Sequence, residues 1–229
     1  VETTSCIAAS YEAKHYGVKT GVPVRQARIL CPKIKFVQAK HEKYVAIHNA
    51  ITKIIHGIVF IDEVLSIDEM YGRLPPKWQS PKIAIEKAEA IKTALKEGIG
   101  PCITASIGIA PNRFIAKLAS KMKKPDGLML IDHPQLPQAL DSLDLSDITG
   151  IGARMLIRLK NQGILDVASL CQADRSTLHR IWGSIEGDRF WYALRGIALP
   201  EQSTSKRSFG HSHVCLLYTS PSPRDGIGS

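Results

Sequence analysis

The sequence lacks long apolar runs, closely spaced cysteines and any zinc-type spacing of its eight histidines. No stretch approaches the roughly 18 to 20 apolar residues that a membrane helix needs, so we expect no membrane segment. No Cys-x-x-Cys pair occurs, which excludes a zinc knuckle or a small disulfide scaffold and favours reduced thiols in a cytoplasmic protein. The five cysteines are Cys6, Cys31, Cys102, Cys171 and Cys215.

Acidic residues are in deficit. The 229 residues include 30 Lys and Arg but only 21 Asp and Glu, giving a formal net charge of +9. Such an excess favours binding to a polyanion, because Lys and Arg displace counterions from phosphates. With 44% hydrophobic and 22% charged residues, the chain is typical of a soluble protein that buries a core in one or two domains.

The spacing of apolar residues changes character along the chain. Helical spacing alternates with strand-like runs over residues 34–131, which predicts a mixed α/β layer. Residues 140–198 carry no strand signal and predict a small all-helical domain, so the fold class is α+β. Helices are expected at 10–16, 24–31, 43–55, 83–95 and 113–124, and strands at 34–39, 57–67, 102–109 and 128–131.

The stretch Leu-Ser-Ile-Asp-Glu-Met, residues 65–70, places two adjacent carboxylates at the end of an apolar, strand-like run. Carboxylates are seldom buried without a partner, so Asp68 and Glu69 are expected to bind a cation. Two Mg²⁺ ions held by carboxylates serve nucleotidyl transfer, but neighbouring strand residues point to opposite faces, so the pair converges only at a strand end and needs a further carboxylate. Asp62 and Glu63 are a second candidate pair.

A basic helix is predicted from residue 113 to residue 124. Arg113, Lys117 and Lys121 lie four residues apart along one stripe, opposite an apolar side. This stripe is either a solvated basic face or a surface that presents cations to a triphosphate or to DNA phosphates.

A glycine turn follows at Gly150-Ile151-Gly152, between two short helical segments. Glycines let the backbone approach a ligand closely, so that N–H groups at the next helix can hold a phosphate oxygen. Such a contact reads no base and suits a protein that binds any duplex.

Four blocks of residues together resemble the Y-family translesion DNA polymerases, the UmuC family. They occur in that family's order and at compatible spacing over residues 4–214. The blocks are Ala-Ser-Tyr-Glu-Ala-Lys with Gly-Val-Lys-Thr-Gly (9–21), Leu-Ser-Ile-Asp-Glu (65–69), Ser-Ile-Gly-Ile-Ala-Pro-Asn to Lys-Pro-Asp-Gly (106–127), and Thr-Gly-Ile-Gly (149–152).

The resemblance implies a right-hand polymerase that transfers nucleotides from dNTP to a primer 3′ hydroxyl in error-prone translesion synthesis. It implies fingers at 1–35, a palm at 36–131, a thumb with a helix-hairpin-helix at 132–203 and the start of a little finger at 204–215. By this likeness Asp68 and Glu69 are catalytic and hold two Mg²⁺ ions. Tyr11, Lys14 and Lys117 would bind the nucleotide, and DNA would be bound by Arg113, Lys121, Gly150, Ile151 and Gly152.

The chain also departs from the family pattern. Family members usually begin with a strand that carries a further metal-binding Asp and an aromatic steric gate, and we expect both upstream of Val1. Residues 216–229 resemble a translated sequencing adapter and are expected to be a non-native tail, so we expect a fragment with little activity of its own. Lys14 stands where Arg is frequent, and Met70 and Gly72 replace other residues common at their positions.

Two other functions are considered. A non-catalytic DNA-binding or partner-recruiting relative would keep the scaffold without the reaction, and a helix-hairpin-helix nuclease would cleave a duplex rather than extend a primer. The expected partners are primer–template DNA and dNTP, with a sliding clamp bound through absent C-terminal residues, and the expected state is a monomer.

Overall fold

The computed structural model describes residues 4–200. The chain divides into two compact units, with the first 39 residues in one and residues 40–202 in the other. Each unit is described by itself. The predicted start of a little finger at 204–215 and the predicted tail at 216–229 lie outside the described residues.

The first unit contains two short helices, α1 (Tyr11–His15) and α2 (Val24–Leu30). Ser10 caps α1 by accepting a hydrogen bond from the Ala13 N–H at 3.3 Å. The strand predicted at 34–39 is wrong, since these residues form no strand. Ile34 and Phe36 do alternate toward the small core, but the described residues offer no neighbouring strand to pair with them.

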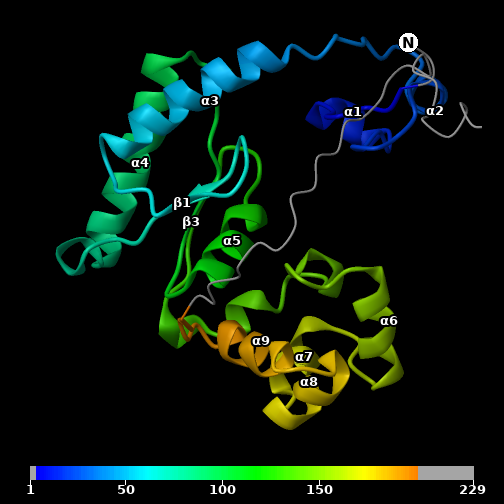
Figure 1. Cartoon of the computed structure of the whole chain (residues 1–229), viewed down its shortest axis with the longest axis vertical. Helices are drawn as coiled ribbons and strands as arrows, with labels where there is room; N and C mark the ends of the chain where they lie inside the picture. The colour runs from blue at the N-terminus through cyan, green and yellow to red at the C-terminus, as the bar shows by residue number, and fades with distance from the viewer. Residues whose placement is uncertain (1–3, 201–229) are drawn as a thin grey trace, which may run out of the picture. The chain divides into compact units, whose positions relative to one another are not determined.

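The second unit begins with a helix and a short hairpin. Helix α3 (His41–His56) packs against α4 (Pro81–Gly98), as Figure 1 shows. Between them, β1 (Glu63–Val64) pairs antiparallel with β2 (Met70–Tyr71), and η1 (Pro76–Trp78) is a single 3-10 turn. The strand predicted over 57–67 is therefore mostly wrong, because only two of its residues find a partner strand.

A parallel pair of strands carries the basic helix. β3 (Ile107–Ile109) leads into α5 (Arg113–Met122), which returns to β4 (Leu128–Leu130). Gly108 lets the helix approach the strand, since a Cβ there would lie 1.9 Å from the Ala116 carbonyl oxygen. The helix and β4 were predicted correctly, whereas the strand expected from residue 102 begins only at Ile107.

Helices and 3-10 turns are the only regular elements among the described residues after 132. Three 3-10 turns, η2 (His133–Gln135), η3 (Gln138–Leu140) and η4 (Leu145–Asp147), come first. They are followed by α6 (Ala153–Asn161), α7 (Val167–Gln172), α8 (Arg175–Trp182) and α9 (Glu186–Leu194), which gather together in Figure 1. This agrees with the all-helical pattern of the sequence.

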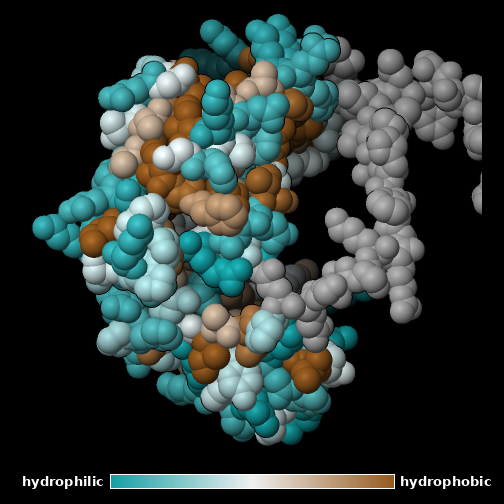
Figure 2. Space-filling view, turned by 60° about the vertical axis from the view of Figure 1, so that its left-hand side comes forward, coloured by the Kyte–Doolittle hydropathy of each residue, from teal (hydrophilic) through white to brown (hydrophobic). Residues whose placement is uncertain are grey.

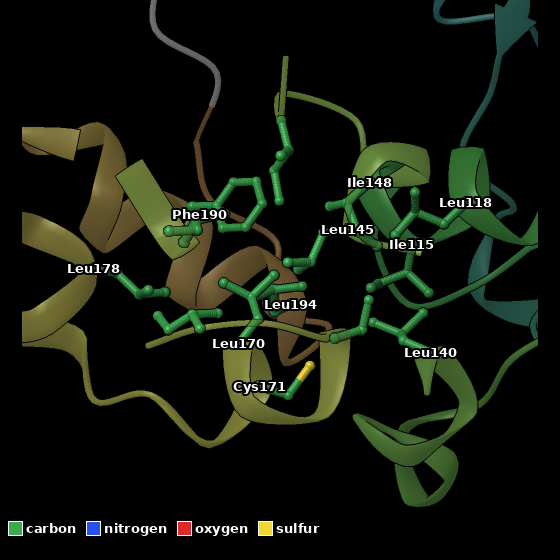
Figure 3. Packing of buried hydrophobic residues seen from close by; sticks show 14 of the residues in the cluster. Ile115, Leu118, Leu140, Leu145, Ile148, Leu170, Cys171, Leu178, Phe190 and Leu194 are labelled. Carbon is green, nitrogen blue, oxygen red and sulfur yellow. The ribbon is translucent and has the colours of Figure 1, made fainter. Parts of the chain in front are cut away.

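The main hydrophobic core joins α5 to these helices. Ile115 and Leu118 are fully buried on α5 and lie beside Leu140, Leu145 and Ile148 in Figure 3. Phe114 of the same helix meets Phe190 of α9 edge to face, with ring centroids 5.3 Å apart. The basic stripe of α5 is thus held on a rigid helix whose other side is anchored in the core.

The surface carries apolar residues as well as charge. Figure 2 shows apolar residues gathered in a band across the upper part of the face in view. Exposed large apolar side chains of the second unit include Val45, Phe60, Val64, Ile67 and Ile85. In the described part of the chain, no helix combines the length and apolarity required to cross a membrane.

Candidate active site

Asp68 and Glu69 lie in the turn that joins β1 to β2, and both are exposed. The turn is closed by the backbone N–H groups of Leu65 and Ser66, which donate to the Glu69 carbonyl oxygen at 2.8 and 3.1 Å. The Ser66 hydroxyl donates to Oδ1 of Asp68 at 2.7 Å. The expectation that these carboxylates end a buried strand is wrong, because both lie in an exposed turn. Their side chains therefore do not have to point to opposite faces, as neighbouring residues of a strand do.

Glu69 has a cationic partner from a distant part of the chain. The ammonium of Lys117, on α5, lies 2.7 Å from Oε2 of Glu69. Leu118 and Ile115 bury the opposite side of α5, which turns the basic stripe toward the hairpin. The structure therefore brings together two of the residues that the sequence selected separately.

Arg113 makes a similar contact one turn earlier on α5. Its Nη1 lies 3.0 Å from Oε2 of Glu63, and its guanidinium stacks over the Tyr71 ring at 4.4 Å. Arg113 contacts both strands of the hairpin and Lys117 contacts the turn between them, so α5 and the hairpin form one structural unit.

The alternative pair Asp62 and Glu63 is occupied by arginines. Both Nε and Nη2 of Arg73 lie 3.2 Å from Oδ1 of Asp62, across the hairpin. Arg113 binds Glu63. Asp68, by contrast, forms no ion pair with any residue in the described range, and its carboxylate accepts only from Ser66. This difference favours the turn over the Asp62–Glu63 pair as a cation site.

The donor atoms of the turn suit Mg²⁺ in kind, since carboxylate oxygens are its usual protein ligands. Their number is small. Among residues 4–200, no three or more His, Cys, Asp or Glu side chains cluster in a way that could hold a metal ion. Metal binding by Asp68 and Glu69 therefore stays a prediction, and Glu69 would have to exchange its 2.7 Å contact with Lys117 to bind an ion.

Two further predicted nucleotide contacts lie in the first unit. Tyr11 and Lys14 sit on the same side of α1, with the Lys14 ammonium 4.5 Å from the centroid of the Tyr11 ring. Tyr11 is 45% exposed, so its ring is accessible. The sequence thus predicted a pair whose members are in contact, and their role toward a nucleotide stays a prediction.

The glycine turn precedes α6. Gly150 has a φ of +95°, a conformation that side-chain-bearing residues rarely adopt, and Gly152 is the N-cap of α6. A Cβ on Gly152 would meet nothing within 4 Å, so the backbone there is open to a ligand. Ile151 differs, because its side chain is buried and its N–H donates to the Ile148 carbonyl.

Lys121 links α5 to the segment before this turn. Its ammonium donates to the Asp147 carbonyl at 3.2 Å and lies 3.4 Å from the Thr149 hydroxyl. At the other end of α5, Asn112 caps the helix and its Nδ2 donates to the Ala193 and Ile197 carbonyls at 2.9 and 3.2 Å. Helix α5 therefore holds both the carboxylate turn and the helical region.

Sequence reasoning missed two contacts of this site. His48 on α3 places Nδ1 2.8 Å from the Ile67 carbonyl oxygen, next to Asp68. Asn112 was assigned no role beyond its place in a motif, although it bridges α5 and α9. A lone histidine within a helix gives no sequence signal, and the partner of Asn112 lies 81 residues away.

Comparison with known proteins identifies relatives. A family model described as "impB/mucB/samB family" matches residues 1–121, more than half of the chain. DNA polymerase IV of Moorella thermoacetica is 33% identical over 210 residues, covering 90% of this chain and 52% of that protein. DNA polymerase IV 1 of Bacillus subtilis is 34% identical, covering 90% and 50%. The chain spans about half the length of these relatives.

Solved structures agree with these sequence matches. An insertion ternary complex of Dbh DNA polymerase has a TM-score of 0.72 and 30% identity, covering 83% of this chain and 56% of that chain. A DinB family error prone DNA polymerase from Sulfolobus solfataricus has a TM-score of 0.71 and 28% identity, covering 86% and 60%. The resemblance to the Y-family polymerases is confirmed, and the chain belongs to the impB/mucB/samB family.

Proposed function

We propose that the chain is part of a DNA-directed DNA polymerase that carries out error-prone translesion synthesis. The names of its relatives support this function, since they are DNA polymerases IV and one similar structure is an error prone polymerase. The net charge of +9 suits a protein that binds DNA phosphates. The proposed substrates are a primer–template duplex and a dNTP.

The observation that carries the proposal is the contact between Lys117 and the carboxylate turn. Glu69, the neighbour of Asp68, and Lys117 come from segments 48 residues apart, with 2.7 Å between the Glu69 carboxylate and the ammonium. Carboxylates that can hold Mg²⁺ beside a cation that can hold a triphosphate are the chemistry that nucleotidyl transfer requires. A solvated basic face would not need to meet these carboxylates.

In this mechanism Asp68 and Glu69 hold Mg²⁺, with two ions expected in the complete enzyme. Bound Mg²⁺ would neutralise the triphosphate and promote attack by the primer 3′ hydroxyl. Lys117, once it leaves Glu69, is free to donate to the phosphate oxygens of the nucleotide. Tyr11 and Lys14, in the first unit, are proposed to contact the phosphates of a nucleotide.

The DNA backbone is proposed to bind at the glycine turn and along α5. Gly150 and Gly152 let a phosphate approach the first N–H groups of α6, which have no acceptor among the described residues. Ile151 contributes by holding the turn in the core. Arg113 and Lys121 would add positive charge beside the duplex, in addition to the internal contacts already described.

We also propose the division into fingers, palm and thumb. The first unit corresponds to fingers, the hairpin with the β3–α5–β4 segment to a palm, and the helices after residue 132 to a thumb with a helix-hairpin-helix. A sliding clamp as partner and a monomeric state stay predictions.

Primer extension tests the proposal. Since the chain spans about half of its relatives, we would assay it alone and as a chimera in which residues 4–200 replace the matching segment of the Bacillus subtilis relative. The chimera should extend a primer with dNTP and Mg²⁺, and Asp68→Asn should reduce the rate by about 10³-fold or more, because metal ions supply several kcal/mol to such transition states. Intact Mg²⁺-dependent extension by the Asp68→Asn chimera would refute the proposal.

The alternative is a non-catalytic DNA-binding relative. The small number of metal ligands near Asp68 among residues 4–200 favours this candidate for the chain by itself. It predicts that the chimera binds primer–template DNA as tightly as the unmodified relative, yet incorporates no nucleotide at any Mg²⁺ concentration.

A further inference from the structure

His48 makes the only hydrogen bond to the backbone of the carboxylate turn from another element of the described structure. Its Nδ1 lies 2.8 Å from the Ile67 carbonyl oxygen, and the ring is half-buried on α3. A carbonyl oxygen only accepts, so Nδ1 must carry the proton.

The peptide unit that His48 holds is the one that carries Asp68. The Ile67 carbonyl and the Asp68 N–H belong to the same planar group, so fixing one fixes the other. The Asp68 N–H itself reaches only the Ser66 hydroxyl, at a long 3.4 Å. His48 is therefore the stronger constraint on the orientation of this peptide.

Apart from the Lys117–Glu69 ion pair and the backbone bonds to the Glu69 carbonyl, the described residues provide few contacts to the tip of the turn. Ser66, Ile67, Asp68 and Glu69 are all exposed, so no buried side chain anchors the tip of the hairpin. The hairpin is short, with two residues in each strand, and short hairpins are marginally stable by themselves. A single hydrogen bond to a packed helix can then decide which conformation of the turn predominates.

We propose that His48 is a positioning residue that fixes the carboxylate turn and thereby orients Asp68. The effect of His48 on metal binding and nucleotidyl transfer rests on the proposed function. The effect of His48 on the conformation of the turn does not, so the two effects can be tested separately.

Substituting His48 by asparagine or by glutamine separates the loss of this hydrogen bond from other effects of the substitution. The Nδ2 of an asparagine occupies nearly the position of the histidine Nδ1, whereas the Nε2 of a glutamine occupies that of the histidine Nε2. His48→Asn should therefore keep the bond, and His48→Gln and His48→Ala should lose it. Helix propensity predicts the opposite order, because Gln favours a helix more than Asn does.

Amide hydrogen exchange by NMR on the 229-residue chain tests the effect on the turn. The Leu65 and Ser66 amides report turn closure, since both donate to Glu69. Their exchange should quicken about 3- to 10-fold in His48→Gln and His48→Ala, the range of one net hydrogen bond. It should stay near wild type in His48→Asn and in the control His41→Ala on the same helix. Equal rates in all four variants, or rescue by Gln rather than Asn, would overturn the proposal.

Mn²⁺ binding, followed by electron paramagnetic resonance, tests the consequence for the metal. The Asp68→Asn variant should bind Mn²⁺ more weakly than the wild-type chain. His48→Ala and His48→Gln should each weaken Mn²⁺ binding about 3- to 10-fold. If His48→Ala and His48→Gln bind Mn²⁺ as tightly as the wild-type chain does, the positioning role is overturned. Absence of any Asp68-dependent binding would count against the proposed function, while hydrogen exchange would still decide the role of His48.

Discussion

The ammonium of Lys117 lies 2.7 Å from Oε2 of Glu69, so a cation proposed to hold a triphosphate is paired with a carboxylate proposed to hold Mg²⁺. Both groups are partly exposed, with side-chain exposures of 33% and 45%. The pair is therefore screened by solvent and easily exchanged. Under the proposed function, each partner would be released when the other binds its ligand, which would link metal binding to nucleotide binding.

Removing the ammonium should strengthen divalent-ion binding. Lys117→Ala frees Glu69 from a competing cation, and because exposed ion pairs contribute about 0.2–1 kcal/mol, Mn²⁺ affinity should rise about 1.4- to 5-fold. dNTP affinity should fall in the same variant. Isothermal titration calorimetry measures both, with Lys123→Ala as a control that removes an equal charge just beyond the end of α5. Weaker Mn²⁺ binding in Lys117→Ala would contradict the linkage.

Asn112 combines two structural roles that substitution can separate. Its Oδ1 caps α5 by accepting from the Ile115 N–H at 2.8 Å, while its Nδ2 bridges to carbonyls at the end of α9. Asn112→Ser keeps a cap and loses the bridge, and Asn112→Ala loses both. We expect a loss of about 1–3 kcal/mol in the serine variant and about 1 kcal/mol more in the alanine variant.

Urea unfolding measures this series. The bridge joins α5 to α9 within one compact unit, so its loss should lower the free energy of unfolding without a change in far-UV circular dichroism. A serine variant as stable as wild type would show that Nδ2 makes no net contribution.

The site was partly predictable from sequence because some of its features are local. The basic stripe of α5 follows from helical periodicity, and the carboxylates were singled out by their position after an apolar run. Strand lengths were not predictable, because residues 57–61 and 34–39 look strand-like but lack a partner strand in the described structure. His48 and Asn112 depend on tertiary contacts that no local pattern encodes.

The two glycines of the turn before α6 should respond differently to alanine. Gly150 has a φ of +95°, so Gly150→Ala should lower the free energy of unfolding by about 1–2 kcal/mol. Gly152 has a φ of −87° and open space around its Cβ position, so Gly152→Ala should change stability by less than about 1 kcal/mol.

Duplex binding should depend on Gly152, although stability depends more on Gly150. A methyl group on Gly152 occupies the space that a phosphate needs, and fluorescence anisotropy with a labelled primer–template should show weaker binding by folded Gly152→Ala. A Gly152→Ala chain that binds DNA as tightly as wild type would remove this turn from the proposed interface.

The pH dependence of stability should reveal the ion cluster at Asp126. Hydrogen bonds from Lys92 and then Lys96 hold the pKa of the Asp126 carboxyl below its usual value. Lys92 is only 8% exposed and also donates to the Ala105 carbonyl at 3.1 Å. Because the pKa is lower in the folded state, the stabilisation is present above the unfolded pKa and is lost as pH falls through the folded value.

Asp126→Asn isolates this charge with little disturbance of the backbone. Asp126 has a φ of +52°, which Asn tolerates about as well as Asp. The variant should be less stable than wild type at pH 7, and the difference should shrink as the carboxyl protonates in acid. Urea unfolding from pH 7 to pH 3 measures the convergence. Lys96→Ala should lower the free energy of unfolding less than Lys92→Ala does, because Lys96 is 44% exposed whereas Lys92 is buried. A constant gap between wild type and Asp126→Asn across this range would show that the stabilisation comes from the shape of the turn rather than from the charge on Asp126.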